Sequence, residues 1–290
     1  MKNYKVSVIV NCLNGERFVN RSIKSILNQS YQNFEIIFWD NKSIDNSLKI
    51  VKKLQKENNK IRIFSSKKTI KLYEARNKAI QKAKGKYIAF LDIDDTWYKK
   101  KLSIQIKKIQ SDQTKIIYTN HWITKNNKKI LFAKQKLPYG NLSKQIIRKY
   151  PICISTVLLE KKCFQKIGLF NKNYEIIGDF DFFFRISHHY KFSIIQEPVA
   201  TYYIHGENFS LLKMNLRIQE MYDWLNIQKM TNFYKNNKDD YLKIEDKNLY
   251  FDIIYNLKKK KITYTLASIK KIKSIKLKIK AYLKLLNNII

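Results

Sequence analysis

The chain has 290 residues, of which 44% are hydrophobic, enough to bury the core of one large domain or of a domain with a sizeable extension. No apolar run is long enough to span a bilayer, and Cys12, Cys153 and Cys163 show neither zinc-binding nor disulfide spacing. We therefore expect a cytoplasmic protein with reduced thiols, outside the zinc-binding, disulfide-rich and membrane-spanning classes.

The balance of charge is strongly positive. Lys and Arg number 58 against 23 Asp and Glu, which gives a formal net charge of +35. Charge of this size favours polyanionic surfaces such as nucleic acid or anionic lipid. Ile, Asn and Lys are abundant together throughout the chain, as expected from an AT-rich coding sequence, so part of the excess reflects composition rather than function.

The first hundred residues alternate between apolar strands and amphipathic helices. Strands are predicted at residues 6–10, 34–39, 61–64 and 87–91, with a helix in each interval. Strands and helices in this order predict an α/β fold with a mostly parallel central sheet and right-handed crossovers. Polar residues follow every strand at its carboxyl end, where open α/β sheets bind their ligands.

The strongest local signal is the fourth strand, which runs into Asp92, Asp94 and Asp95. Three carboxylates this close repel one another, and a divalent cation with oxygen ligands is the least costly way to keep them ionised. The alternative is an acidic turn in which Asp95 or Thr96 caps a helix that begins near Trp97. The triplet alone leaves both interpretations open.

Glycine-rich phosphate loops are absent from the sequence. Neither GxGxxG nor GxxxxGK[ST] occurs, which argues against dinucleotide-binding enzymes and P-loop NTPases. A nucleotide bound without such loops must be held by side chains and a metal. Asp40, at the end of the second strand, is well placed to accept a hydrogen bond from a ribose hydroxyl or a base N–H. The alternative role for Asp40 is that of a turn former or helix cap.

The middle of the chain carries weaker patterns. A basic amphipathic helix is predicted from Trp97 to Gln110 and a strand at 116–118. Residues 125–136 are polar and lysine-rich and predict a hairpin or loop, whereas 151–159 are expected to return to the sheet.

Five segments of the first hundred residues resemble family 2 glycosyltransferases of the GT-A fold, in order and in spacing. They are Ser7–Glu16, Ser25–Tyr31, Phe34–Ser47, Ala75–Asn77 and Leu91–Asp95. The resemblance implies a Rossmann-like sheet flanked by helices, a nucleotide-sugar donor, a divalent metal (Mn²⁺ or Mg²⁺) at a DxD motif, and inversion at the anomeric carbon.

The resemblance also implies roles for individual residues. Asp40 is similar in position to the residue that recognises the base, Arg76 to the arginine that supports the carboxylates and donor phosphates, and Asp94 to the metal ligand. The other expected donor contacts are Asn11, Asn14, Glu16, Asp92 and Ile93, with Asp92 and Asp95 as further candidate metal ligands. This chain has Asn11-Cys12 and Asn41-Lys42 where the family usually has Pro-Thr and Asp-Gly, which leaves the choice of nucleotide open.

Two later segments resemble the acceptor-side and terminal blocks of the same family. In Ile177–Arg185 the resemblance makes Asp179 the candidate catalytic base; at a helix N-terminus it would stay ionised. Asp181 is the reserve, although an ion pair with Arg185 four residues later is the preferred interpretation for it. In Thr201–Ser210, His205 is the candidate third metal ligand, and a purely structural histidine is the alternative.

Beyond Leu211 the pattern becomes helical and basic. Residues 258–290 contain eleven lysines and no acidic residue. The apolar positions of this segment, which recur every three or four residues, are Leu266, Ile269, Ile272, Ile275, Ile279, Tyr282 and Leu286. This spacing predicts a basic amphipathic helix that lies on an anionic membrane surface, or alternatively packs on the catalytic domain or a partner with its lysines in water.

The expected organisation is a GT-A catalytic domain over 1–210, with a nucleotide-sugar half (1–119) and an acceptor half (120–210), followed by a basic helical extension over 211–290. The expected activity is metal-dependent, inverting transfer of a sugar, from a UDP-linked donor by preference, to a glycan or lipid-linked acceptor. The enzyme would be cytoplasmic, with a peripheral site on the inner face of the cell membrane as the second option.

Two other functions were weighed against this one. A sugar-phosphate nucleotidyltransferase would place a glycine- and arginine-rich loop after the first strand, where this chain has only Asn14-Gly15-Glu16-Arg17. A basic nucleic-acid-binding protein would match the charge but would leave the acidic residues at successive strand ends unexplained, so no nucleic-acid partner is expected.

Overall fold

The structure is a computed structural model that describes residues 4–289. The chain forms two compact units. The first, which we call the sheet unit, comprises residues 4–142, 151–174 and 178–205. The second, the helical unit, comprises residues 143–150, 175–177 and 206–289. Each unit is described by itself.

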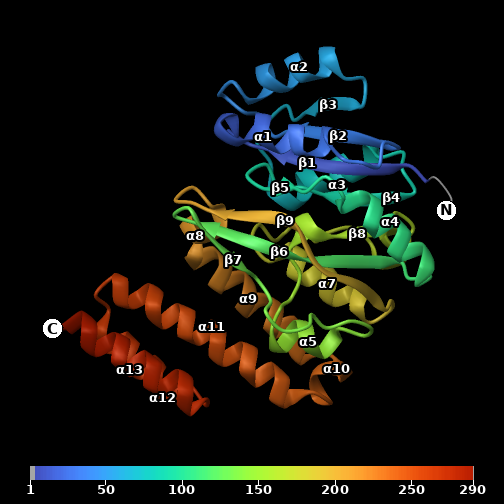
Figure 1. The fold of residues 1–290 in the computed structure, drawn as a ribbon. Coiled ribbons are helices and arrows are strands. Elements are labelled where there is room, and N and C mark those ends of the chain that lie inside the picture. Colours follow the sequence, from blue (N-terminus) through green and yellow to red (C-terminus); the bar gives the residue numbers. More distant parts are fainter. Residues whose placement is uncertain (1–3, 290) are drawn as a thin grey trace. The chain divides into compact units, whose positions relative to one another are not determined.

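The first half of the sheet unit is a parallel α/β arrangement, as predicted. Its strands lie in the order β3-β2-β1-β4, and every neighbouring pair is parallel (Figure 1). All seven positions of β2 are buried, and so are all but one in β1, because helices cover both faces of the sheet. The elements are β1 (Val6–Cys12), α1 (Glu16–Leu27), β2 (Phe34–Asp40), α2 (Ser47–Glu57), β3 (Ile61–Ser65), α3 (Leu72–Lys82) and β4 (Tyr87–Phe90).

The second half of the sheet is mixed, so the expected parallel arrangement is complete in the first four strands and is kept in one later pair. Strand β8 lies antiparallel between β4 and β6, and β9 runs parallel to β6. Strand β5 is antiparallel to β9, and β7 forms a hairpin with β6. The strands are β5 (Thr96–Trp97), β6 (Ile116–Lys125), β7 (Lys128–Leu131), β8 (Leu158–Glu160) and β9 (Phe192–Ile204). The helices are α4 (Lys101–Ser111), α6 (Cys163–Ile167) and α7 (Gly178–Ser187), together with the 3₁₀ turn η1 (Ile154–Thr156).

Two predicted boundaries in this half are wrong. The helix expected to begin at Trp97 begins at Lys101, because Thr96 and Trp97 pair with β9 instead. The Trp97 indole N–H also donates to the carbonyl of Ser155 at 2.7 Å, which fixes the buried ring. Of the segment 151–159, only the last two residues belong to a strand of the sheet, β8. The lysine-rich excursion is the predicted hairpin, turned by Asn126 and Asn127 with φ of 47° and 61°.

The helical unit is built around the long helix α11. Its core joins Tyr250, Ile253 and Leu257 of α11 to apolar residues of α12 and α13. The helices are α5 (Ser143–Arg148), α8 (Phe209–Leu212), α9 (Met214–Lys229), α10 (Asn232–Lys235), α11 (Lys238–Lys258), α12 (Ile262–Lys271) and α13 (Ile275–Ile289). None of the helices within residues 4–289 is both long enough and apolar enough to cross a membrane.

The prediction of a single helix after Ile262 is wrong. Two helices form instead, because the helix is interrupted between Lys271, where α12 ends, and Ile275, where α13 begins. The Asp246 carboxylate of α11 accepts hydrogen bonds from the backbone N–H groups of Lys273 at 2.9 Å and Ser274 at 2.6 Å. A carboxylate at this place stabilises the start of α13, since the first N–H groups of a helix have no partner inside it. The three cysteines are free thiols, as expected, and Cys12 and Cys163 are buried.

Candidate functional site

The ends of β1 and β2 carry two loops that bind each other. Ser43 Oγ accepts from the backbone N–H of Asn14 at 3.0 Å, and the Asn14 side chain accepts from the N–H of Ile44 at 2.9 Å. The Glu16 carboxylate accepts from the backbone and side-chain N–H groups of Asn46 at 3.0 and 2.8 Å. Asn14 and Glu16, predicted as donor contacts, therefore hold the two loops together in this structure.

Asp40 closes β2 beside Cys12, its register partner on β1. The Asp40 carboxylate is buried and accepts from the N–H of Ser43 at 3.3 Å, the turn-forming contact that was its alternative role. Asn11, whose register partner on β2 is Trp39, has a buried side-chain Nδ2 with no hydrogen-bond partner among the described residues. An unsatisfied buried donor is costly, so a ligand with a hydrogen-bond acceptor at the end of β1 would be stabilised there. Ile93, the other expected donor contact, packs on the core cluster close to Gly15.

Asp92 is the centre of a cluster of charges. The Arg76 guanidinium, itself buried, donates to Asp92 Oδ1 at 2.7 Å. Burial raises the pKa of Asp92 to about 6, Arg76 opposes the rise, and the charges of Asp94 and Asp179 add to it. Because 39% of the Asp92 side chain is exposed, water screens part of this effect. The dependence on Asp94 and Asp179 shows that carboxylates from separate parts of the sequence lie close together here.

Asp94 and His205 form a direct pair. Asp94 Oδ2 lies 3.0 Å from His205 Nε2. The Phe18 ring of α1 packs against the His205 ring with centroids 4.6 Å apart. Arg21, one turn further along α1, donates to the backbone carbonyl of Asp94 at 2.7 Å and lies 3.8 Å from the centroid of the Tyr203 ring. These contacts fix both members of the pair from one side.

Asp95 has a different role from its neighbour. It is fully buried, accepting from the Ser155 hydroxyl at 2.6 Å and from the backbone N–H of Tyr203 at 3.2 Å. Burial, followed by the charges of Asp94 and Asp92, holds the pKa of Asp95 well above its usual range. Both carboxylate oxygens bind the scaffold, which argues against Asp95 as a metal ligand.

Asp92 and Asp95, the further candidate ligands, do not form a metal-binding group with Asp94 and His205 in the described residues. Within residues 4–289 no group of three His, Cys, Asp or Glu side chains is arranged to hold a metal ion. The pair Asp94 and His205 still fits a divalent ion of the Mg²⁺ or Mn²⁺ type, because one carboxylate and one imidazole are suitable ligands and such ions take several of their oxygens from substrate phosphates and water.

Asp179 lies in the first turn of α7, at the helix N-terminus as predicted. The Tyr73 hydroxyl donates to Asp179 Oδ1 at 3.1 Å. Asp181 forms the expected ion pair with Arg185 at 2.9 Å, and Arg185 also binds the carbonyls of Ile167 and Leu169. The pairing gives Asp181 a structural role. Asp179 is the acidic residue of α7 whose charge contributes to the raised pKa of Asp92.

Sequence reasoning missed three residues that contact the site: Phe18, Arg21 and Tyr73. Tyr73 precedes Arg76 by three residues, so helical spacing could have placed both on one face of α3. Phe18 gave no signal beyond that of an apolar residue in the helix predicted after the first strand. Arg21 gave no signal, because its partner Asp94 is 73 residues away in the sequence.

The geometry brings the predicted acidic residues to one edge of the sheet. Strand β1 lies between β2, which ends in Asp40, and β4, which leads into Asp92 and Asp94. All three strands are parallel, so their carboxyl ends share that edge (Figure 1). An edge with an unmet donor at one strand end, and an arginine and several carboxylates at another, is suited to a polar ligand that carries phosphate.

The sequence of this chain is similar to that of a known glucosyltransferase. The chain is 35% identical over 146 residues to UDP-Glc:alpha-D-GlcNAc-diphosphoundecaprenol beta-1,3-glucosyltransferase WfgD of Escherichia coli, a match that covers 50% of this chain and 57% of WfgD. The chain thus spans somewhat more than half the length of this relative.

Two solved structures share the fold. S. aureus TarS 1-349 in complex with UDP-GlcNAc superposes with a TM-score of 0.64 at 16% identity, over 85% of this chain and 81% of that chain. Mannosyltransferase PcManGT from Pyrobaculum calidifontis, in complex with GDP-Man and Mn2+, gives a TM-score of 0.67 at 12% identity, over 100% of this chain and 82% of that chain.

These likenesses confirm the expected fold class, the α/β GT-A fold, followed here by C-terminal helices. The family model described as Glycosyl transferase family 2 matches residues 7–184, more than half of the sequence. The chain therefore belongs to glycosyl transferase family 2.

Proposed function

We propose that this protein transfers a sugar from a UDP-linked donor to a hydroxyl group of a glycan or lipid-linked acceptor, with inversion at the anomeric carbon. The single observation that carries the proposal is the charge cluster of Asp92, in which Arg76, Asp94 and Asp179 meet. The donor class is supported by the names of WfgD and of the TarS complex, and the lipid-linked acceptor by the name of WfgD.

The residues divide the work between the two substrates. Asp40 and the Asn11 side chain, whose Nδ2 has no partner among the described residues, are assigned to the nucleoside, and Asn14 and Glu16 position the loops beside them. Arg76 neutralises the diphosphate and holds Asp92. In domain terms, residues 1–119 bind the donor, 120–210 complete the acceptor side, and 211–290 form a helical extension.

Asp94 and His205 would hold the divalent metal. When bound, such a metal supplies positive charge to the departing diphosphate. Their contacts with Phe18 and Arg21 keep the two ligands in place before the ion arrives. Asp95 is not included among the ligands in this proposal.

Asp179 acts as the base. The acceptor oxygen forms a bond to the anomeric carbon while the bond from that carbon to the diphosphate oxygen breaks, and the electron pair of that bond leaves with the diphosphate. The acceptor proton passes to Asp179. Attack on the face opposite the leaving group inverts the anomeric configuration.

The test is nucleotide release from a panel of UDP- and GDP-sugars with added Mn²⁺ or Mg²⁺. Asp179→Asn should lower transfer about a thousandfold while donor binding remains, since only the proton acceptor is lost. Asp94→Asn should abolish the metal dependence of donor binding. Glu74→Gln, a change at an exposed carboxylate of α3, is the matched control and should keep full activity. Full activity in both site variants would refute the assignment, and release of pyrophosphate from a nucleoside triphosphate would favour a nucleotidyltransferase.

A further inference from the structure

Helix α13 has two apolar faces rather than the single one expected from the sequence. Ala281 and Leu285 are buried in the core of the helical unit. On the other side, Ile275, Ile279, Leu283 and Leu286 are each more than half exposed to solvent. Their spacing of four, eight and eleven residues from Ile275 places them along one side of the helix. This second face has no cover within the helical unit.

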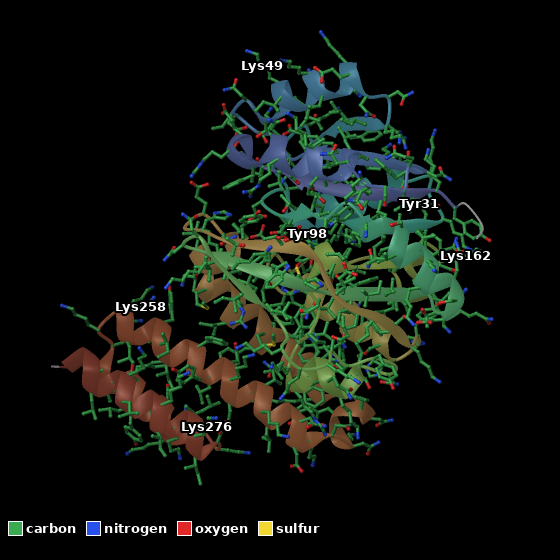
Figure 2. The ribbon with its side chains drawn as sticks, in the orientation of Figure 1. Tyr31, Lys49, Tyr98, Lys162, Lys258 and Lys276 are labelled. Atoms are coloured by element: carbon green, nitrogen blue, oxygen red, sulfur yellow. The ribbon has the colours of Figure 1, made fainter. Side chains whose placement is uncertain are left out.

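Lysines border this exposed face. At about 100° per residue, Lys276 lies beside it on one side and Lys278 on the other, with Lys280 and Lys284 further round. Lys258 and Lys276 are labelled in Figure 2, at the end of α11 and on α13. No acidic residue occurs from 258 to 290 to offset the eleven lysines.

We propose that this face of α13 binds an anionic lipid bilayer, with the helix lying in the plane of the interface. The four apolar side chains would enter the boundary between headgroups and acyl chains, while the lysines meet lipid phosphates. A second copy of the chain fits less well, because each copy has a net charge of +35 and would bring lysines against lysines. Nucleic acid matches the charge but leaves the apolar side chains in water.

The experiment is co-sedimentation of the full chain with vesicles of phosphatidylcholine, alone or mixed with phosphatidylglycerol. We expect binding only to the mixed vesicles. The double variant Ile279→Ser with Leu283→Ser should weaken binding by at least about tenfold, and so should Lys276→Gln with Lys280→Gln. These substitutions lie on exposed positions, but Lys280 Nζ also lies 5.4 Å from the centroid of the Tyr250 ring, so circular dichroism checks that the helices remain.

Two controls separate this face from general stickiness or charge. Met230→Ser removes an exposed apolar side chain elsewhere in the helical unit, and Lys49→Gln with Lys52→Gln removes two lysines from α2. Both should bind like the parent chain. The proposal is overturned if the lysine control loses as much vesicle binding as the α13 lysine variant, or if the apolar variant loses none. It is also overturned if the chain forms a dimer in the absence of vesicles. The result is independent of glycosyl transfer.

A separate observation concerns the neighbours of Asp179. Position 178 has no room for a side chain, because the Tyr73 ring fills the space beside it. A Cβ at this position would lie 2.4 to 2.6 Å from three ring atoms. The Tyr73 ring is buried, stacks near Phe170 at 5.4 Å and lies 5.2 Å from the Arg76 guanidinium. It therefore has little freedom, and its hydroxyl donates to Asp179 Oδ1 at 3.1 Å.

We infer that Tyr73 is the positioning residue of the base, holding the Asp179 carboxylate through this hydrogen bond. The inference rests on the proposed function, in which Asp179 takes the acceptor proton. A donor to a carboxylate favours its ionised form, so the hydroxyl also keeps the base ready over a wider range of pH.

Tyr73→Phe keeps the ring and removes the hydroxyl. We expect kcat to fall about tenfold with the donor KM unchanged, and the acidic limb of the pH profile to move upward by about half a pH unit or more, since Asp179 would lose a stabilising donor. In an Asp179→Asn background the same change should have no further effect, because the hydroxyl acts through Asp179. Gly178→Ala, which displaces the ring, should lower kcat in the same direction.

The outcomes distinguish the two claims. If Asp179→Asn keeps full activity, the assigned base is wrong and the proposed mechanism fails with it. If Asp179→Asn is inactive but Tyr73→Phe leaves both kcat and the pH profile unchanged, only the role of Tyr73 is refuted. A thermal unfolding curve for Tyr73→Phe shows whether a loss of activity reflects a loss of fold.

Discussion

Buried carboxylates are used in opposite ways in the two units. In the helical unit, Glu220 accepts hydrogen bonds from three consecutive backbone N–H groups, those of residues 175–177, at 2.6 to 3.1 Å. Asp246 similarly accepts from two backbone N–H groups at the start of α13. In the sheet unit, burial first and the charges of neighbouring carboxylates second raise the pKa of Asp92 to about 6 and hold the pKa of Asp95 well above its usual range.

The difference separates structure from chemistry. A carboxylate satisfied by peptide N–H groups stabilises the fold and leaves little capacity for a ligand. Asp92, whose side chain is partly exposed, carries a cost of burial and repulsion that is typical of sites that bind a cation or move a proton, whereas Asp95 carries a similar cost while bound to the scaffold. The predictions below test this contrast, from the largest expected effect on the free energy of unfolding to the smallest.

Glu220→Ala should destabilise the protein by about 4 kcal/mol, because three buried N–H groups lose their acceptor at once. Chemical denaturation followed by circular dichroism measures the change. Asp223→Ala, at an exposed carboxylate of the same helix that accepts a hydrogen bond from Gln219, is the control and should stay within about 0.5 kcal/mol of the parent. Equal losses in both variants would break the contrast.

His121 is a buried histidine whose protonation should lower the stability of the folded state. Its Nδ1 has no hydrogen-bond partner, it stacks on Phe132, and burial lowers its pKa to about 4. The unfolded chain binds the proton more readily, so the folded state loses stability as pH falls from about 6.5 to about 4, by about 3 kcal/mol in total. The stability of His121→Phe should lack this component when the two proteins are compared at several pH values. Parallel pH curves would show that His121 is protonated without cost.

Asp246→Ala should cost about 1.5 kcal/mol, since α13 loses the acceptor for two N–H groups at its start. The loss should be local as well. Hydrogen exchange at Lys273 and Ser274 should accelerate, whereas exchange in the sheet unit stays the same. Uniform acceleration over the whole chain would instead mean that Asp246 supports global stability.

Asp95→Asn should have the smallest effect and the opposite sign. Because the pKa of Asp95 is raised in the folded state, folding binds a proton, and the ionised carboxylate is a burden at high pH that disappears at low pH. The Asn variant should therefore be more stable than the parent by about 1 kcal/mol at pH 8 and equal to it at low pH. A destabilised variant at pH 8 would show that the Ser155 and Tyr203 bonds need the charge.

The limits of sequence reasoning follow from how far apart the partners are. Strands β1, β2 and β4 were predictable because both of their faces are buried and they read as continuous apolar runs. Strand β5 was not, since its two residues pair with residues more than a hundred positions away. Asp94 and Asp95 look alike in the sequence, and only the distant Ser155 and Tyr203 distinguish them. The break before α13 likewise depends on Asp246, a residue of another helix.

Helix α1 touches the site at two places. Near its start Glu16 binds the loop after β2 through Asn46, while Phe18 and Arg21 support His205 and Asp94. Because one helix contacts both the loop after β2 and the Asp94–His205 pair, a tilt of α1 would move both together. Under the proposed function, cavity-forming changes beneath the helix, at the buried residues Val19 or Ile23, should therefore alter donor affinity and turnover in parallel.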